Sequence, residues 1–142
     1  MFRNPNVEVR EEVELTVAAK SQSLAHTTNL DSPTFVLAQG YNRFQGIAHV
    51  ADLLTTKALT VTLLQATDTA GTGAKVLGTA ATHTASGTES LVAIADEHET
   101  ALDTENSFLY VGVRVSHSNT TGALTVGTIL GMVPNYKPAS NN

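Results

Sequence analysis

Two stretches of this chain alternate apolar and polar residues with a period of two, and this pattern constrains the fold most. Residues 58–66 place Leu59, Val61 and Leu63 on one side and threonines on the other. Successive side chains of a β-strand point to opposite faces of a sheet, so the pattern predicts a strand with one buried face. Residues 108–116 follow the same rule, with these residues predicted to face inward: Leu109, Val111, Val113 and Val115.

Further segments carry strand signals and are separated by turn residues. From Glu12, Val13, Leu15 and Val17 alternate with polar or small residues, which predicts a half-buried strand. Residues 20–33 are polar and are expected to form a loop. The other expected strands are 34–38, 44–50 (with a bulge at Gly46), 75–84, 88–95 and 124–133, and one helical turn is expected within 96–105.

About eight short strands with regularly spaced turns predict an all-β fold, an antiparallel β-sandwich or jelly-roll-like barrel. The 142 residues suit one domain. We expect an N-terminal arm over 1–12, a β domain over 13–133 and a C-terminal tail over 134–142, with both ends extended. Oligomeric proteins commonly lay such ends on neighbouring subunits, although ends that are simply frayed are also common.

Composition excludes several function classes. The net charge is -5 and the eight Lys and Arg residues are scattered singly, so we expect no nucleic-acid partner. Cysteine is absent, which rules out disulfides and thiolate metal sites. Without a long apolar run or an apolar leader at the N-terminus, we expect no membrane partner and synthesis in a cytoplasm. Only 15% of residues are charged, which suits surfaces that lie against other proteins.

Candidate chemical motifs are incomplete. Gly71-Thr72-Gly73-Ala74-Lys75 resembles a phosphate loop, but a strand is expected to follow it, so a hairpin loop explains it better. The acidic cluster Asp96-Glu97-His98-Glu99 lacks the second histidine of a zinc helix and the spacing of a calcium loop. We therefore predict no metal site and no cofactor.

The five histidines are dispersed, at positions 26, 49, 83, 98 and 117, and no nucleophile elbow accompanies them. His83 and His117 are expected to be satisfied surface groups. Tyr110 beside Arg114 is at most a fragment of a stacking platform for a carbohydrate or a base, and a packing contact explains it better. We predict that the chain has no catalytic residues and is not an enzyme.

The stretch from Leu59 to Val115 resembles a group of small virion proteins encoded beside the major capsid protein of tailed bacteriophages. In that group, a strand ending in Gln-Ala-Thr-Asp leads to a Gly-rich turn. A late strand then carries Tyr-Val-Gly-Val-Arg-Val, and a final Gly-rich strand ends near Pro-x-Tyr. The matching elements here are Gln65–Asp68, Tyr110–Val115 and Pro134–Tyr136, so the similarity covers about half the chain and leaves residues 1–33 outside it.

The resemblance implies a capsid decoration, or cement, protein, which is a β-rich and often trimeric subunit on the outer capsid. Such a subunit would clamp neighbouring capsid subunits against internal DNA pressure. Its expected partners are the major capsid protein and two further copies of itself in a homotrimer, and its expected location is the virion surface after assembly in the host cytoplasm. We expect these residues of the two arms to form the interface: Phe2, Arg3, Asn4, Pro5, Val7, Val9, Arg10, Pro134, Tyr136 and Lys137.

Three alternatives stay open at this point. The chain could be another virion subunit, such as a head-tail connector or tail protein. It could be a carbohydrate-binding β-sandwich module that uses Tyr41 or Tyr110. The third alternative is a small hydrolase that uses one of the scattered histidines.

Overall fold

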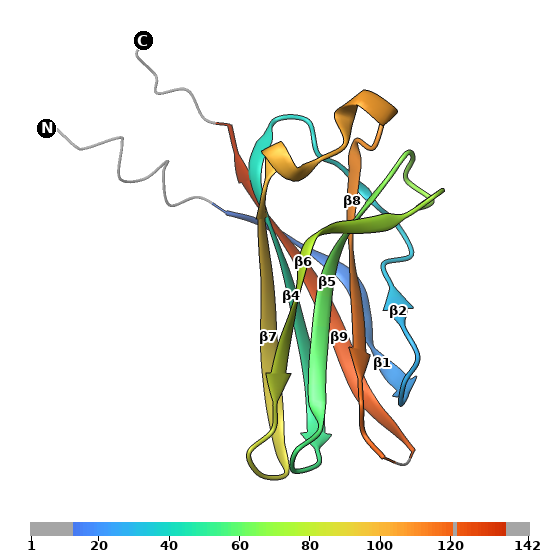
Figure 1. Ribbon diagram of the computed structural model, residues 1–142, viewed down its shortest axis with the longest axis vertical. Coiled ribbons are helices and arrows are strands. Elements are labelled where there is room, and N and C mark those ends of the chain that lie inside the picture. Colours follow the sequence, from blue (N-terminus) through green and yellow to red (C-terminus); the bar gives the residue numbers. More distant parts are fainter. Residues whose placement is uncertain (1–12, 121, 136–142) are drawn as a thin grey trace, which may run out of the picture.

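A computed structural model of the protein describes residues 13–120 and 122–135, and in that part of the chain strands dominate (Figure 1). Two single-turn 3-10 helices, η1 (Glu99–Ala101) and η2 (Thr104–Asn106), are the helical elements described there. The strands are β1 (Glu14–Ala25), β2 (Leu30–Asp31), β3 (Val36–Leu37), β4 (Tyr41–Leu53), β5 (Ala58–Ala66), β6 (Lys75–Thr84), β7 (Glu89–His98), β8 (Tyr110–His117) and β9 (Ala123–Pro134).

The strands form two antiparallel sheets that pack face to face. One sheet has the order β1-β9-β4-β7, and the other has the order β2-β8-β5-β6, with β3 also paired to β8. In Figure 1, β5, β6 and β8 lie in front, and β1, β4 and β9 lie behind them. If β2 and β3 are counted as one interrupted strand, every connection except the β5–β6 hairpin passes from one sheet to the other. This arrangement is a jelly roll, which confirms the predicted fold class.

The interruption between β2 and β3 has a local cause. Pro33 has no backbone N–H to donate to a ladder, and the residue before it takes over the pairing with β8. The Ser32 N–H donates to the Val113 carbonyl at 2.9 Å, and the Ser32 hydroxyl accepts from the Val113 N–H at 2.8 Å. Next to this point, the Arg114 guanidinium donates to both carboxylate oxygens of Asp31, at 2.7 and 3.0 Å, and this contact raises the pKa of Arg114.

The core lies between the two sheets and is built from the alternating residues of β5, β8 and β4. As predicted, Leu59, Val61 and Leu63 are fully buried, and so are the inward valines of β8. Leu109 was predicted to face inward as well, but it precedes β8, outside the alternating strand, and is 40% exposed. The fully buried side chains include Phe44, Leu77, Val111, Val113, Val115 and Leu130.

Gly46 does not form the predicted bulge. Its pairing with β7 and β9 continues without a register shift on either side. A Cβ at this position would lie 3.2 Å from Val113 Cγ1 and 3.3 Å from Leu63 Cδ2. The glycine therefore allows β4 to approach the opposite sheet closely.

Phe35 anchors a second, smaller cluster on the outward side of β5 and β8. It is buried there with Leu64 and Ala66. A Cβ added to Gly71 or to Gly112 would come within 2.8 Å of the Phe35 ring, so the ring lies directly over both glycines. The glycine of the Tyr-Val-Gly-Val-Arg-Val motif thus serves aromatic packing.

Asp68, which ends the Gln-Ala-Thr-Asp motif, organises the loop between β5 and β6. Its Oδ1 accepts from the N–H groups of Ala70 and Thr72 at 3.0 Å, and its Oδ2 accepts from the Thr72 hydroxyl at 2.6 Å. These hydrogen bonds, first of all the one from the Thr72 hydroxyl, lower the pKa of Asp68 below its ordinary value of 3.8.

The lowered pKa predicts a pH dependence of stability. Because the unfolded chain binds this proton more readily than the folded chain, the contribution of Asp68 is complete above pH 3.8. It is lost as pH falls further, through the depressed pKa of the folded state. We expect Asp68→Asn to lower the urea midpoint at pH 7 and to differ less from the wild type at pH 3. An equal difference at both pH values would contradict this role of the carboxylate.

Two further predictions from sequence need correction or refinement. Residues 20–25 belong to β1 and not to a loop, because an edge strand that is exposed on both sides tolerates polar residues such as Lys20 and Gln22. Within residues 96–105, one helical turn was predicted, and η1 confirms it. A second turn, η2, follows directly, while Asp96, Glu97 and His98 still belong to β7.

Candidate interaction surface

The outward face of the β1-β9-β4-β7 sheet carries a continuous row of aliphatic side chains. Val17 of β1 pairs with Ile129 of β9, and Ile129 pairs with Ile47 of β4. Ile47 in turn pairs with Ile94 of β7. Directly paired residues point to the same face of a sheet, with Cβ atoms about 5 Å apart, so the four side chains form one row across all four strands.

The most exposed members of this face lie on its two edge strands. We call Val13, Leu15 and Val17 the β1 ridge, and Val92 and Ile94 the β7 ridge. Leu15 and Val17 are each 64% exposed, and Val92 and Ile94 are 55% and 52% exposed. Five of the nine large apolar side chains exposed in the described part of the chain belong to these ridges, so exposed apolar surface is concentrated here.

The β1 ridge contradicts the sequence-based orientation of this strand. Val13, Leu15 and Val17 were predicted to be its buried residues, but Ala18, Ala19 and Leu24 are buried instead. Two register shifts, between Val17 and Ala19 and between Ala19 and Gln22, each place an extra residue on β1. Alternation identified the strand correctly, but the side that faces the core is the opposite one from Val13 to Val17, and the bulge after Val17 lets both Ala18 and Ala19 be buried.

Between the ridges, two glycines of β9 lie beneath side chains of the neighbouring strands. A Cβ at Gly131 would lie 3.2 Å from Leu15 Cδ2 and 3.5 Å from Val13 Cγ1, so both side chains lean over it. A Cβ at Gly127 would lie 2.5 Å from His49 Nε2, and this nitrogen is 3.3 Å from the Ser21 hydroxyl. Side chains of the two neighbouring strands therefore cover both glycines.

An ion pair lies on this face. Arg43 of β4 and Asp96 of β7 pair with each other. Both side chains are substantially exposed, so the pair contributes little to stability.

One polar contact fixes the start of β1 beside the start of β4. The Tyr41 hydroxyl donates to Glu14 Oε1 at 2.6 Å. This hydrogen bond, together with partial burial and the negative charge of Glu14, raises the pKa of Tyr41 above its ordinary value of 10.0. Figure 1 shows that β1 begins and β9 ends at the same end of the body.

Of the predicted interface residues, Pro134 is the one that the structure describes. It is the last residue of β9, pairs with Tyr41 and is half-buried, so it belongs to the sheet and not to a tail. The others lie outside the described residues: Phe2, Arg3, Asn4, Pro5, Val7, Val9, Arg10, Tyr136 and Lys137.

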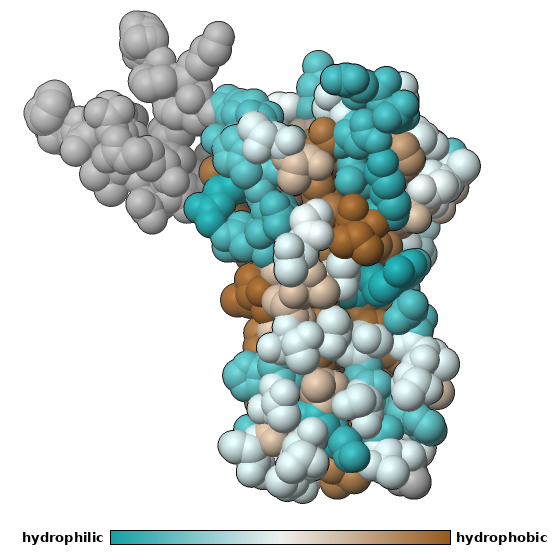
Figure 2. Space-filling model, in the orientation of Figure 1, coloured by the Kyte–Doolittle hydropathy of each residue, from teal (hydrophilic) through white to brown (hydrophobic). Residues whose placement is uncertain are grey.

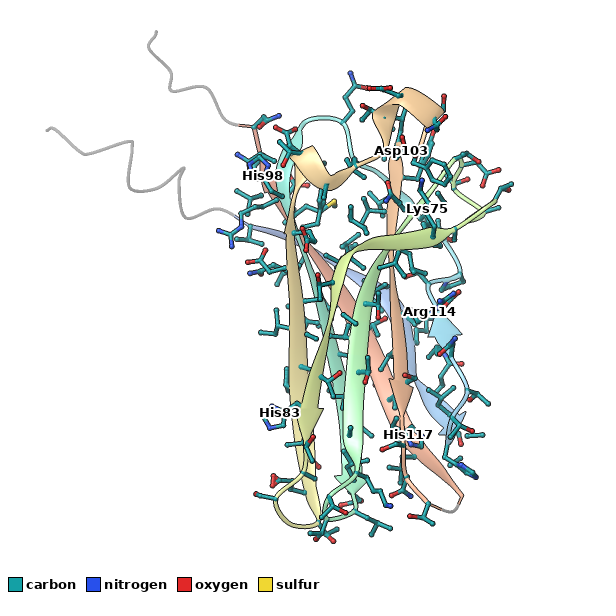
Figure 3. The ribbon with its side chains drawn as sticks, viewed as in Figure 1. Lys75, His83, His98, Asp103, Arg114 and His117 are labelled. Carbon is teal, nitrogen blue, oxygen red and sulfur yellow. The ribbon has the colours of Figure 1, made fainter. Side chains whose placement is uncertain are left out.

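The glycine-rich segment before Lys75 connects two paired strands, as predicted for a hairpin loop. Gly71 and Gly73 have positive φ angles, of 84° and 66°, which suit the loop. The Lys75 ammonium donates to Asp103 Oδ2 at 2.5 Å and lies 4.1 Å from the centroid of the Phe108 ring (Figure 3). Lys75 thus holds the η1–η2 connection against β6.

The labelled histidines do not gather at one place: Figure 3 shows His98 at the upper end and His83 and His117 on opposite sides of the lower half. His98 Nδ1 accepts from the Thr100 N–H at 3.2 Å and caps η1. His117 is buried, contrary to its prediction as a surface group, because it continues the inward positions of β8. Its Nε2 lies 2.7 Å from the Leu24 carbonyl of β1, and its Nδ1 accepts from the Asn119 N–H.

The acidic cluster is split by the alternation of β7. Asp96 points outward to Arg43, whereas the Glu97 carboxylate accepts from the Thr79 N–H at 3.3 Å on the other side. Among residues 13–120 and 122–135, no three His, Asp or Glu side chains are grouped closely enough to hold a metal ion. In the same residues, no helix has the length and apolar character that a bilayer crossing requires.

The two tyrosines considered for carbohydrate stacking lie on different sheets. Tyr41 belongs to β4 and bonds Glu14, while Tyr110 belongs to β8 and packs beside the Phe35 cluster. They do not form one platform. In the lower part of Figure 2, the face formed by β5, β6 and β8 carries mostly hydrophilic (teal) or intermediate (pale) residues, with scattered hydrophobic (brown) ones.

Comparisons with known proteins show which solved structures share this fold. No protein-family model matches the sequence, and no curated protein matches it either. Solved structures do match. The subunit of a T13 particle of infectious bursal disease virus superimposes with a TM-score of 0.54 at 10% identity, over 88% of this chain and 31% of that chain.

The Gx strain of infectious bursal disease virus gives a TM-score of 0.52 at 11% identity, over 88% of this chain and 34% of that chain. The fold is a viral capsid-type jelly roll. A cellulose-specific carbohydrate-binding module also matches, with a TM-score of 0.48 at 9% identity, over 87% of this chain and 79% of that chain. This jelly roll spans about a third of the length of the viral chains that it matches.

Proposed function

We propose that the protein is a structural subunit of a virion, and more specifically a decoration protein on the outer capsid of a tailed bacteriophage. The observation that supports this most is a capsid-type jelly roll whose outward sheet face exposes two aliphatic ridges. Exposed apolar side chains that are concentrated on one face mark sites where a protein binds another protein. The fold likeness and the sequence resemblance both favour capsid subunits as that partner.

The mechanism requires adhesion and no chemistry. A subunit that binds the assembled lattice, and not free capsid subunits, stabilises the lattice by mass action. Presentation as a homotrimer would add avidity, because the second and third contacts become intramolecular. A stiff β body with few charges on its binding face suits this role, because charge is depleted at the cores of interfaces.

Labelling would separate the shell from the connector and the tail. Gold-conjugated antibody raised against the chain should decorate the whole capsid surface of particles in electron micrographs. Label confined to one vertex or to the tail would contradict the decoration role and favour another virion component. Absence of the chain from purified particles would contradict the virion role altogether.

The terminal segments are predicted to make part of the capsid contact. A chain lacking residues 1–12 and 136–142 should keep its urea midpoint, because both deletions spare β1 and β9. Its affinity for capsids should fall at least about tenfold, which corresponds to about 1.4 kcal/mol. Single deletions serve as matched controls, and unchanged capsid binding by the doubly truncated chain would remove this proposal.

A further inference from the structure

A cavity of about 160 Å³ lies at the border where β1 faces the interrupted edge formed by β2 and β3. β1 is the edge strand of one sheet, and β2 is the edge strand of the other. The lining of the cavity includes Thr16, Val17 and Ala18 of β1 together with Ser32, Pro33 and Thr34. The last three residues separate β2 from β3, so the cavity lies at the interruption of that edge.

The cavity opens into the space between the two sheets. Leu130 of β9 lines it, is 1% exposed and pairs with Thr16 of β1, so both side chains point to the inner side of their sheet. Val36 also lines it and pairs with the buried Val111 of β8, so Val36 points inward from the opposite sheet. Thr16 is exposed although it points inward. Its exposure shows that the cavity is open to solvent beside β1.

We propose that this cavity receives one neutral side chain of the capsid subunit, of leucine or phenylalanine size, which anchors the contact made by the β1 ridge. Val17 belongs to that ridge and also lines the cavity, so the cavity continues the surface that is proposed to bind the capsid. A side chain that fills a pocket at an interface commonly carries a large share of the binding energy. The inference rests on the proposed function and names the group that the capsid offers.

The lining and the volume decide the chemistry of the occupant. None of the described residues that line the cavity carries a charge, so a charged group would lose its hydration there without gaining an ionic partner. The Ser32 hydroxyl already accepts from the Val113 N–H at 2.8 Å, whereas Ala18, Val36 and Leu130 offer apolar contact. A cavity of about 150 Å³ holds one benzene molecule. The volume therefore suits one aromatic ring or one branched aliphatic group.

The absence of cysteine allows the cavity to be filled chemically in the full-length chain. The thiol of Thr34→Cys is unique and lies at an exposed position of the lining. Benzyl methanethiosulfonate attaches a ring there, and methyl methanethiosulfonate attaches a group too small to fill the cavity. The benzyl adduct should bind capsids about tenfold more weakly or worse, while the methyl adduct binds like the wild type. Thr82→Cys, at an exposed position of β6, is the matched control, and neither reagent should change its binding.

Two further measurements identify the occupant. In the free benzyl adduct, ring-current shifts of the Leu130 methyl signals should show that the ring enters the cavity, and unshifted signals would overturn the inference. On capsids, a benzophenone maleimide attached to Thr34→Cys should crosslink to the capsid subunit on illumination. Crosslinks only to a second copy, or only within the chain, would overturn it as well.

The outcomes separate this inference from the proposed function. If the wild type binds capsids and the benzyl adduct of Thr34→Cys binds them equally well, the capsid role stands and the anchor in the cavity does not. If the wild type does not bind capsids at all, the proposed function fails, and the inference fails with it.

Discussion

Replacement of Phe35 with alanine is expected to lower the free energy of unfolding by about 3–5 kcal/mol, the usual cost of removing a buried aromatic ring. Phe35 is only 3% exposed and closes the cluster of Leu64 and Ala66. The loss would be large because the glycines under the ring, Gly71 and Gly112, have no side chains to fill the space. Urea unfolding followed by circular dichroism measures it.

Gly112→Ala tests the same packing from the other side. Its Cβ would lie 2.8 Å from the Phe35 ring, so the substitution should cost about 1–3 kcal/mol in the wild type. In the Phe35→Ala background, it should cost much less, because the clash is gone. Gly87→Ala is the control, since no atom lies within 4 Å of the added Cβ. Equal costs of Gly112→Ala in both backgrounds would contradict the account.

Replacement of His117 with alanine is expected to cost about 2–4 kcal/mol. The buried imidazole joins the two sheets, because its Nε2 lies against the Leu24 carbonyl of β1 while β8 belongs to the opposite sheet. Removal of the ring takes away this partner and the acceptor of the Asn119 N–H, and it also leaves a cavity.

His83→Ala provides the matched control for His117. His83 is exposed on the edge strand β6, so its removal should change the free energy of unfolding by less than about 0.5 kcal/mol. Both variants are compared by urea unfolding at pH 7. Similar small losses for His83→Ala and His117→Ala would show that the link between β1 and β8 is unimportant.

The bounds of a strand were predictable from the sequence where clear turn residues enclose it. The bounds of β5 and β6 match the predicted 58–66 and 75–84, because glycine-containing turns at 67–74 and 85–88 mark where these segments begin or end. The β-sandwich and jelly-roll class is confirmed by the two sheets. The pairing of β1 with β9 was beyond local patterns, because it joins the two ends of the chain.

The candidate surface was missed for a physical reason. Alternation shows that the two sides of a strand differ, but tertiary packing decides which side is covered. In β1, the larger apolar residues Leu15 and Val17 face outward, while the small Ala18 and Ala19 fill the space against the core. An aliphatic side chain that faces outward on an edge strand has the same sequence signature as one that is buried.

Above all, we propose that this jelly roll adheres to an assembled capsid and stabilises it. The most direct measurement is the temperature at which capsids lacking the protein release their contents, recorded as the purified full-length chain is added. We predict that this temperature rises and saturates at a fixed ratio of chain to capsid subunit, with no binding to unassembled subunits. An unchanged release temperature in the presence of excess folded chain would contradict the account.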